Sequence, residues 1–442
     1  MGIKVCKFGG TSLADTAQFR KVQAIIQADP QRHYVVPSAP GKRSAHDKKI
    51  TDLLYLCHAH TQQEIPFDDV FHIIAERYLD IAAELGLKLD LQPHLAQIKK
   101  HIAQAAGDSG TADYAASRGE YLSGLILADL LGYDFIDPAE VIFFDAHGKF
   151  DSEHTQHALT RRLKKHARAV IPGFYGSTPG GAVKTFSRGG SDITGAIVAR
   201  GAAAEVYENW TDVNGLLMAD PRIVPNPRNI EVVTYKELRE LAYMGASVLH
   251  DEAIFPVRLA GIPINIRNTN QPDHPGTTIV QNTAPIPSKA TITGIAGRKD
   301  FTVIAVEKAM MNAEIGFGRR LLAVLEDLGI SYEHTPSGID TMSVVVADAQ
   351  LKDKQEQVIA DIKARCNPDA VEVYPHMALI ATVGRGMAHT PGMAARMFTA
   401  LAHAKVNIRM IDQGSSELNI IVGIKADDFE KAVRAIYDAF VS

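Results

Sequence analysis

The chain has 442 residues, more than one hydrophobic core usually accommodates, so we expect two or three domains. Its composition, 46% hydrophobic and 22% charged, is typical of a globular protein and excludes a disordered or membrane-embedded chain. A formal net charge of -5 provides no basic surface for nucleic acid or an anionic membrane, so small molecules are the expected partners.

The cysteines and the N-terminus favour a cytoplasmic protein. Cys6, Cys57 and Cys366 are far apart and show no C-x-x-C spacing, so neither a disulfide framework nor a zinc site is indicated. The first residues lack the basic and apolar regions of a secretion signal. No run of 18 apolar residues is present, so we expect no membrane span.

The first ~290 residues alternate short apolar segments with helical patterns, which predicts a mainly parallel sheet covered by helices. A helix is expected over 66–85, because acidic residues fill its first turn and Gly86 follows it. It belongs to a helical insertion expected at about residues 60–110. The predicted strands are 3–5, 34–36, 141–144, 169–171, 205–207 and 264–266.

A proline-rich stretch separates this part from the rest of the chain. Pro285 and Pro287 block both helix and ladder hydrogen bonds. We therefore predict a first domain over 1–282, a linker over 283–290 and a new unit from residue 291.

Beyond the linker the sequence repeats itself. The ten residues from Gly316 align without gaps with the ten from Gly392, and each copy predicts a helix, a strand, a glycine turn and a strand. Two such units, each with one apolar sheet face, are expected to pack side by side. They resemble paired ACT domains, the amino-acid-sensing module, with the first over 291–375 and the second over 376–442. That resemblance also implies that a strand at 292–296 completes the second copy.

A predicted strand at the N-terminus ends in a lysine, two glycines and two hydroxyl residues. Glycine backbone amides can approach phosphate oxygens closely, and a following helix N-terminus favours an anion. The pattern therefore predicts a phosphate-binding loop, although a strand-end lysine followed by an ordinary turn would read the same way. The loop consists of Lys7, Phe8, Gly9, Gly10, Thr11 and Ser12.

A second glycine pair precedes a predicted helix at 193–200. Ser191 or Asp192 would serve as an ordinary N-cap there, but capping does not require Arg188 beside Gly189 and Gly190. The chain contains neither G-x-x-x-x-G-K-[ST] nor G-x-G-x-x-G, so P-loop and Rossmann folds lack their main support.

In combination these motifs resemble the aspartate kinases of the amino-acid kinase family, over almost the whole chain. The resemblance implies an α/β fold, with a mainly parallel sheet sandwiched by helices, followed by two α+β ACT (ferredoxin-like) domains. It also implies that Lys7 and Asp192 are catalytic, with Asp192 organising the lysine and the phosphates. Arg188 and Ser191 would bind the amino-acid substrate, and the phosphates would contact Gly189 and Gly190.

The family's nucleotide segment matches residues 210–222, where Thr211, Asp212 and Arg222 are the expected ATP contacts. Asn-Gly and Asp-Pro pairs in the same segment are also ordinary turn signals. One departure is Leu217, where the family commonly has tyrosine.

A second departure concerns charge. The family's Gly-Ala-Lys-Val-Leu-His, in which lysine meets the ATP phosphates, is similar to residues 245–250, but Ser247 replaces the lysine. We assign Ser247 to the phosphate side of the site. Our hypothesis is that Arg222, Lys184 or His250 supplies the missing charge.

At the substrate end, residues 117–120 read S-x-x-E before an apolar run at 121–131. This pattern is a capping box by itself, and in the resemblance Glu120 binds the substrate ammonium. Ser38 and Thr51 complete the implied substrate contacts, although Pro37 before Ser38 departs from the family's common Val-Val-Ser-Ala form.

The resemblance predicts transfer of the γ-phosphoryl group of ATP, with Mg²⁺, to the side-chain carboxylate of L-aspartate. This is the first step toward lysine, threonine and methionine. Two alternatives remain open: a kinase of another small carboxylate such as glutamate, and a non-catalytic amino-acid sensor. The sequence identifies no metal ligands.

The resemblance also implies regulation and assembly. Lysine, threonine or both are the expected feedback effectors, and a homodimer or dimer of dimers would form through the ACT domains. We expect a monofunctional enzyme, because no dinucleotide-binding unit follows the second repeat. The implied effector contacts are Met311, Gly316, Phe317, Ser337 and Asp340.

Overall fold

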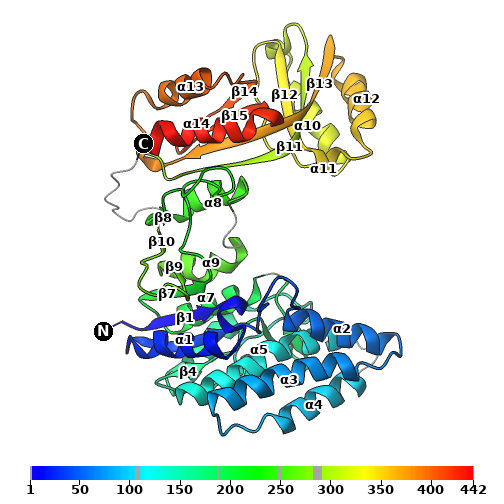
Figure 1. The fold of residues 1–442 in the computed structure, drawn as a ribbon. Helices are drawn as coiled ribbons and strands as arrows, with labels where there is room; N and C mark the ends of the chain where they lie inside the picture. The colour runs from blue at the N-terminus through cyan, green and yellow to red at the C-terminus, as the bar shows by residue number, and fades with distance from the viewer. Residues whose placement is uncertain (1, 105–109, 188, 247–250, 282–290, 442) are drawn as a thin grey trace. The chain divides into compact units, whose positions relative to one another are not determined.

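The computed structural model describes residues 2–104, 110–187, 189–246, 251–281 and 291–441 (Figure 1). The predicted linker at 283–290 lies outside these ranges, and the predicted domain boundaries remain a prediction. Within the described ranges, no helix is both long and apolar enough to cross a membrane. The chain divides into two compact units: Met1–Leu216 with Glu231–Tyr235 and Val248–Ala284, and Leu217–Ile230 with Lys236–Ser247 and Pro285–Ser442.

The described part of the first unit contains an 8-stranded sheet with the order β3-β4-β2-β1-β7-β9-β10-β8. The strands from β3 to β9 in this order pair in parallel, β10 is antiparallel to β9, and β8 is parallel to β10. The predicted mainly parallel α/β architecture is therefore confirmed. The strands are β1 (Lys4–Phe8), β2 (Arg32–Pro37), β3 (Asp134–Phe135), β4 (Ala169–Val170), β7 (Val206–Thr211), β8 (Val232–Thr234), β9 (Ile264–Asn268) and β10 (Thr277–Val280).

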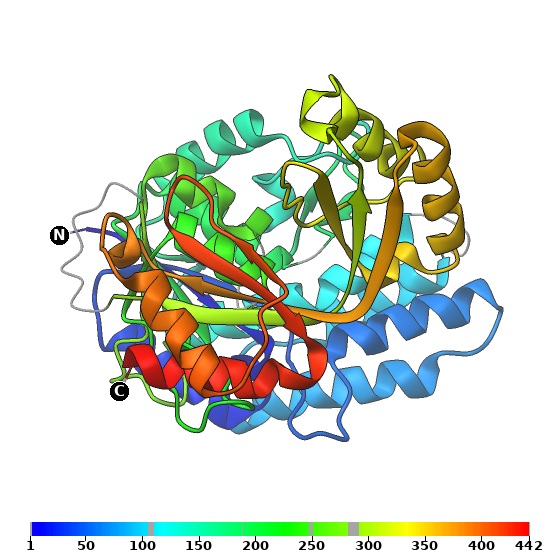
Figure 2. The ribbon, with the colours of Figure 1, turned by 90° about the horizontal axis from the view of Figure 1, so that it is seen from above.

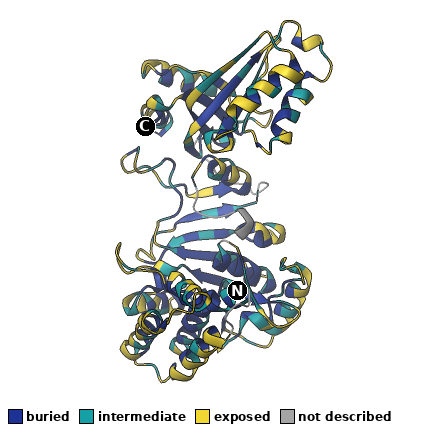
Figure 3. Ribbon diagram, turned by 90° about the vertical axis from the view of Figure 1, so that its right-hand side faces the viewer, coloured by how far each residue is buried: buried dark blue, intermediate teal, exposed yellow. Residues whose placement is uncertain are grey.

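The two faces of this sheet are covered by different helices. Successive side chains of a strand point to opposite faces, so Cys6, Phe8 and Trp210 enter one hydrophobic cluster while Lys7 and Asn209 face the other way. The cluster includes residues of α1 (Thr16–Gln27), α2 (Ile50–Gln62), α3 (Asp68–Leu85), α4 (Gln92–Gln104) and α5 (Gly110–Leu131). The opposite face is covered by α7 (Gly190–Gly201), which packs against α6 (Ser152–Leu163) and α9 (Asp251–Ala260). Figure 3 shows the buried strands between helices whose outer surfaces are exposed.

The predicted helix at 66–85 is confirmed as α3. Asp68 and Asp69 occupy its first turn, and Gly86 ends it with a left-handed backbone at φ 70. Glycine adopts this conformation without the strain that a side chain adds, which explains why the helix stops there.

Two sequence predictions about local structure are wrong. Residues 141–144 form no strand; they follow η2 (Pro138–Glu140) and make only isolated bridges, Phe143 to Ser177 and Phe144 to Phe150. Helix α5 begins at Gly110 and not at residue 121, so the predicted capping box lies inside a helix. Packing buries this polar tract, and the Ser117 hydroxyl donates to the backbone carbonyl of Tyr114 instead of capping.

The second unit contains a 5-stranded sheet with the order β12-β11-β13-β15-β14, and all of its pairs are antiparallel. Its strands are β11 (Gly294–Glu307), β12 (Thr341–Ala347), β13 (Ala370–Val383), β14 (Met410–Asp412) and β15 (Asn419–Lys425). Its helices are α8 (Tyr235–Tyr243), whose first residue belongs to the first unit, α10 (Phe317–Asp327), α11 (Asp348–Leu351), α12 (Gln355–Cys366), α13 (Met393–His403) and α14 (Phe429–Val441). Short 3-10 turns are η3 (Met311–Ala313), η4 (Arg385–Met387) and η5 (Ala426–Asp428).

Both repeats share the two long strands β11 and β13, which run through the unit (Figure 2). The first part of β11 pairs with the last part of β13, as in Ile295 with Thr382, beside β15. The rest of β11 pairs with β12 and with the start of β13. In the first repeat, the strand predicted between the helix and the glycine turn is reduced to isolated bridges, such as His334 with Val345. Its counterpart in the second repeat is β14.

Candidate functional site

The predicted phosphate and substrate residues of the first unit converge on one edge of the parallel sheet. β2, β1 and β7 are neighbours, and their carboxyl ends lead into the segments that begin at Ser38, Gly9 and Thr211. Ligands of parallel α/β sheets bind at this edge, because the loops that follow the strands meet there.

The centre of this edge is an ion pair between buried Lys7 and partly buried Asp192. The Lys7 ammonium lies 2.6 Å from Oδ1 of Asp192, and the Asn209 side-chain amide donates to the same oxygen at 2.9 Å. The N-cap of α7 is Gly189, with φ 58 and no side-chain capping bond. The alternative reading of Ser191 or Asp192 as the N-cap is therefore wrong, because the Asp192 carboxylate is engaged by Lys7 and Asn209.

The glycine loop after β1 lies tightly against the loop after β2. The loop forms η1 (Gly10–Leu13), and the Gly9 amide donates to the carbonyl of Trp210 at 2.9 Å. A Cβ at Gly10 would lie 2.8 Å from the carbonyl oxygen of Ala39, so only glycine fits without a shift. Buried Ser12 exchanges a hydroxyl hydrogen bond with Thr269 at 2.8 Å, which fixes the loop to the end of β9.

Glu120 lies within α5 beside the loop after β2. Its side chain is 5% exposed, and burial raises the pKa of its carboxyl to about 8, although a hydrogen bond from the Ala39 backbone amide opposes the rise. Its Oε2 is buried and has no hydrogen-bond partner among the described residues. Ser38 is held by its backbone amide, which donates to the carbonyl of Phe8 at 3.0 Å, and Thr51 lies in the first turn of α2.

The predicted nucleotide segment leaves β7 and is braced by the turn after β9. The Thr211 hydroxyl donates to Asp212 at 3.2 Å. Asn268 donates to Asn214 at 2.8 Å, and Asn214 donates to Gln271 at 2.8 Å. The start of the segment, as far as Asn214, is therefore held at the same edge as the glycine loop.

Two of the predicted cations, Arg222 and Lys184, are each paired with a carboxylate. Arg222 belongs to the second unit, where its largely exposed side chain pairs with Asp220. Lys184 pairs with Asp113 at 2.8 Å on the hairpin of β5 (Tyr175–Ser177) and β6 (Val183–Thr185). Arg188, Ser247 and His250 lie outside the described residues, so the source of the missing phosphate-side charge remains a hypothesis.

The predicted effector contacts gather at one end of the first repeat. Gly316 is the N-cap of α10 with φ 80, Phe317 is buried, and Oδ1 of Asp340 accepts from the Met310 amide at 2.8 Å. Ser337 bridges to Met342 at the start of β12, and buried Met311 lies in η3.

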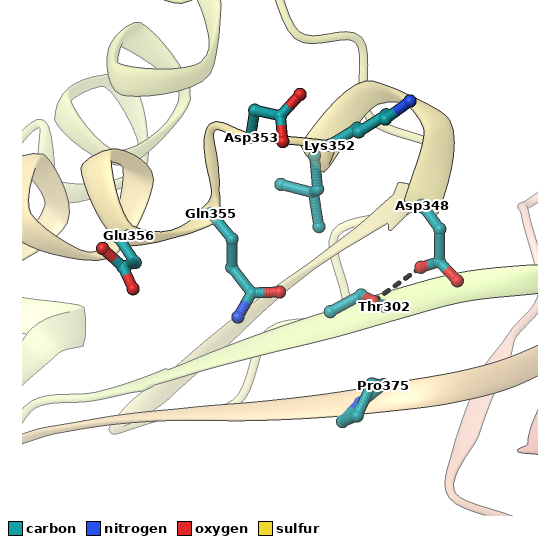
Figure 4. A pocket seen from close by; sticks show the side chains of 8 residues that line it. Thr302, Asp348, Lys352, Asp353, Gln355, Glu356 and Pro375 are labelled. Atoms are coloured by element: carbon teal, nitrogen blue, oxygen red, sulfur yellow. Dashed lines mark hydrogen bonds between the residues drawn. The ribbon is translucent and has the colours of Figure 1, made fainter.

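A cavity of about 630 Å³ lies at the other end of the same strand pair (Figure 4). It includes Thr302, which donates to Asp348 at 2.6 Å. The cavity lies at the end of the β11–β12 pair where Phe301 meets Ala347, and the predicted effector contacts lie at the end where Glu307 meets Thr341. None of the predicted effector contacts lines the cavity.

Comparison with known proteins identifies the family. The model of the amino acid kinase family matches residues 2–268, and an ACT domain model matches residues 380–440. Aspartokinase 3 of Bacillus subtilis is 40% identical over 99% of this chain and 98% of its own length. The chain belongs to the aspartokinase family.

Solved structures of the family agree with this membership. Aspartate kinase from Clostridium acetobutylicum, described as an allosteric enzyme, is 57% identical over the whole of both chains, with a TM-score of 0.90. E. coli aspartokinase III, solved in complex with aspartate and ADP, shares the fold at 24% identity and a TM-score of 0.72. The chain spans 50% of a bifunctional aspartokinase/homoserine dehydrogenase from maize, with 30% identity.

The sequence patterns did not identify Asn209 or Thr269. Asn209 is a fully buried polar residue in the middle of a strand, and a polar side chain at such a position was the available signal. Thr269 follows directly after β9 and has no local motif. Their partners, Asp192 and Ser12, are distant in sequence, so the contacts exist only in the folded sheet.

Proposed function

We propose that this protein transfers the γ-phosphoryl group of ATP to the side-chain carboxylate of L-aspartate and produces 4-phospho-L-aspartate. The observation that carries the proposal is the ion pair of Lys7 with Asp192, at 2.6 Å, on the sheet edge where the glycine loop and the α7 N-terminus meet. The aspartokinase relatives that match nearly the whole chain support the same reaction.

The reaction needs charge neutralisation more than proton transfer. A substrate carboxylate with an ordinary pKa of ~3.9 is already ionised near neutral pH, so no general base is required. The nucleophile and the triphosphate are both anions and repel each other. Lys7 and backbone amides of the glycine loop other than that of Gly9, which donates to Trp210, would offset that repulsion and hold the reacting groups in line.

The substrate end is proposed from Glu120 and its surroundings. A buried carboxylate oxygen without a donor among the described residues suits the ammonium group of an amino acid, which carries three donors. We place Ser38, Thr51 and Ser191 around the same substrate, and Arg188 on one of its carboxylates. Gly173 leaves room for this arrangement, because a Cβ there would lie 2.5 Å from the Ser191 hydroxyl.

Mg²⁺ is proposed to arrive with the nucleotide. Within the described ranges no group of three His, Cys, Asp or Glu side chains is arranged to hold a metal. Kinase Mg²⁺ ions are commonly held mainly by substrate phosphates with only one or two carboxylates, so the nucleotide would supply most of the ligands. The ion would supply further positive charge on the phosphates when bound.

Regulation and assembly are proposed from the two ACT repeats. Lysine, threonine or both would bind at Met311, Gly316, Phe317, Ser337 and Asp340, and would inhibit turnover. We propose a homodimer or dimer of dimers formed through these repeats, and a cytoplasmic location.

One coupled assay tests the proposal. ADP release is measured with aspartate, glutamate or no acceptor, and the acyl phosphate is trapped as a hydroxamate. Aspartate-dependent ADP release with matching hydroxamate is the expected result. Preference for glutamate would indicate a kinase of another carboxylate, and nucleotide binding without hydroxamate would indicate a sensor. Lysine and threonine are then added to test inhibition.

A further inference from the structure

Two adjacent strands present donors to a single carboxylate oxygen. β1 and β7 are parallel neighbours, and Lys7 is the direct pairing partner of Asn209. Their side chains leave the same face of the sheet and meet at Oδ1 of Asp192, at 2.6 Å from the ammonium and 2.9 Å from the amide. Lys7 is 7% exposed and Asn209 is 3% exposed, so both donors are buried, whereas the Asp192 side chain is 19% exposed.

The chemistry of an amide suits this position. A carboxylate held by one donor can rotate about its χ2 angle, whereas two donors from different strands fix its plane. The amide is neutral and does not titrate, so it orients the carboxylate without changing the charge of the pair. A lysine there would add a cation, and an aspartate would add a repelling anion.

We propose that Asn209 is a positioning residue for phosphoryl transfer. Its amide holds the Asp192 carboxylate so that the Lys7 ammonium stays directed at the edge where the phosphates bind. The inference rests on the proposed function, since it assumes that Lys7 acts on the phosphates.

The other face of β7 shows that the strand has an independent anchor. Glu208 accepts from Nε of Arg32 at 2.8 Å and from Nε1 of Trp210 at 2.9 Å, both on the face away from Asp192. Removal of the Asn209 amide therefore leaves the strand anchored. Trp210 is the single tryptophan of the chain, so its fluorescence reports whether this part of the sheet remains packed.

The first test removes the donor at similar volume. Asn209→Leu is expected to lower kcat by about 10- to 100-fold, the range for a lost hydrogen bond to a charged group, while KM for aspartate changes less than about threefold. Trp210 emission should match that of the wild type. A kcat within about threefold of the wild type would overturn the proposal.

The second test converts the amide to a titratable group. In Asn209→Asp the new carboxyl would donate to Asp192 while protonated and repel it when ionised. The ratio of variant to wild-type kcat should therefore rise at least about tenfold as pH falls from 8.5 to 6. The described groups that face this position are Lys7 on β1, Asp192 on α7, Tyr207 and Thr211 along β7, and apolar Ile266 on β9.

A matched control and a structural measurement separate the possible failures. Asn265 pairs with Glu208 in the next strand, and its amide donates to the carbonyls of Pro275 and Thr277, so Asn265→Asp should show a pH-independent ratio. A flat ratio for Asn209→Asp would overturn the proposal. Absence of acyl phosphate with the wild type would instead refute the proposed function. A crystal structure of Asn209→Leu then decides the positioning role: a rotated Asp192 carboxylate supports it, and an unchanged one overturns it.

Discussion

Replacement of Glu120 by Gln is expected to change how the stability of the first unit depends on pH. Burial raises the pKa of the Glu120 carboxyl from 4.5 to about 8 in the folded protein. Between pH 4.5 and pH 8 the folded protein keeps this proton and the unfolded chain has lost it. The stability that the group contributes is therefore fully present below pH 4.5 and is lost progressively as pH rises to about 8. Each pKa unit corresponds to about 1.4 kcal/mol, so this one group should cost about 3.5 kcal/mol between pH 5 and pH 8.

The measured quantity is the fluorescence of Trp210. This single tryptophan lies in the first unit, so its emission reports the unfolding of the first unit separately from that of the second. Urea unfolding is recorded from pH 5 to pH 8 for the wild type, Glu120→Gln and the exposed control Glu84→Gln. The free energy of unfolding of Glu120→Gln relative to the wild type should rise by about 3.5 kcal/mol over this range. Equal pH slopes for the wild type and Glu120→Gln would refute the buried, proton-binding state of this carboxyl.

The same proton should couple to substrate binding. An ammonium group favours the ionised carboxylate, so Glu120 must release its proton when aspartate binds below pH 8. KM for aspartate in the wild type is therefore expected to rise by up to about tenfold per unit as pH falls below 8. A KM that is independent of pH would separate Glu120 from the ammonium.

Three further predictions concern the loop, the ion pair and the effector end. Lys7→Ala should lower kcat by orders of magnitude with unchanged Trp210 emission; turnover near the wild-type level would remove the lysine from catalysis. Gly10→Ala should destabilise the first unit by about 1–3 kcal/mol and raise KM for ATP, because its Cβ would lie 2.8 Å from the Ala39 carbonyl oxygen. The control is Gly180→Ala, since the space around Gly180 is open. Equal effects of the two substitutions would contradict this prediction. Asp340→Asn should raise the inhibitory concentration of lysine or threonine about tenfold without changing uninhibited kcat, because it removes the charge of the carboxylate that accepts from the Met310 amide. The same shift in Asp353→Asn, which follows α11 and lines the separate cavity, would contradict this prediction.

Local patterns sufficed where the structure depends on neighbours in the chain. The acidic first turn and Gly86 defined α3, and two glycines after a strand identified the loop at Gly9 and Gly10. The repeat near Gly316 and Gly392 predicted two similar units because copied sequence folds into copied elements, and α10 and α13 both begin just after these glycines.

The patterns failed where burial or distant contacts decide. The pattern S-x-x-E occurs both as a cap at the start of a helix and as an ordinary turn within a helix. Only the packing that buries Glu120 distinguishes the two cases. Asp192 matched an N-cap locally, but its partners Lys7 and Asn209 come from two strands that are far from it in sequence. The apolar run at 141–144 is buried without a continuous ladder partner, so hydrophobicity alone overpredicted a strand.

The two faces of the β1–β7 pair also explain why a buried ion pair lies beneath the site. Burial alone would raise the pKa of Glu208, but the hydrogen bonds and charge of Arg32, together with hydrogen bonds from Trp210 and Cys6, lower it, so the carboxylate stays charged. The Cys6 thiol donates to the same carboxylate at 3.3 Å, and Cys6 is the pairing partner of Glu208. A slip by one residue would turn each side chain to the opposite face and leave these charges without partners. We infer that the Glu208 network fixes the register, and this register places Lys7 opposite Asn209 on the face covered by α7.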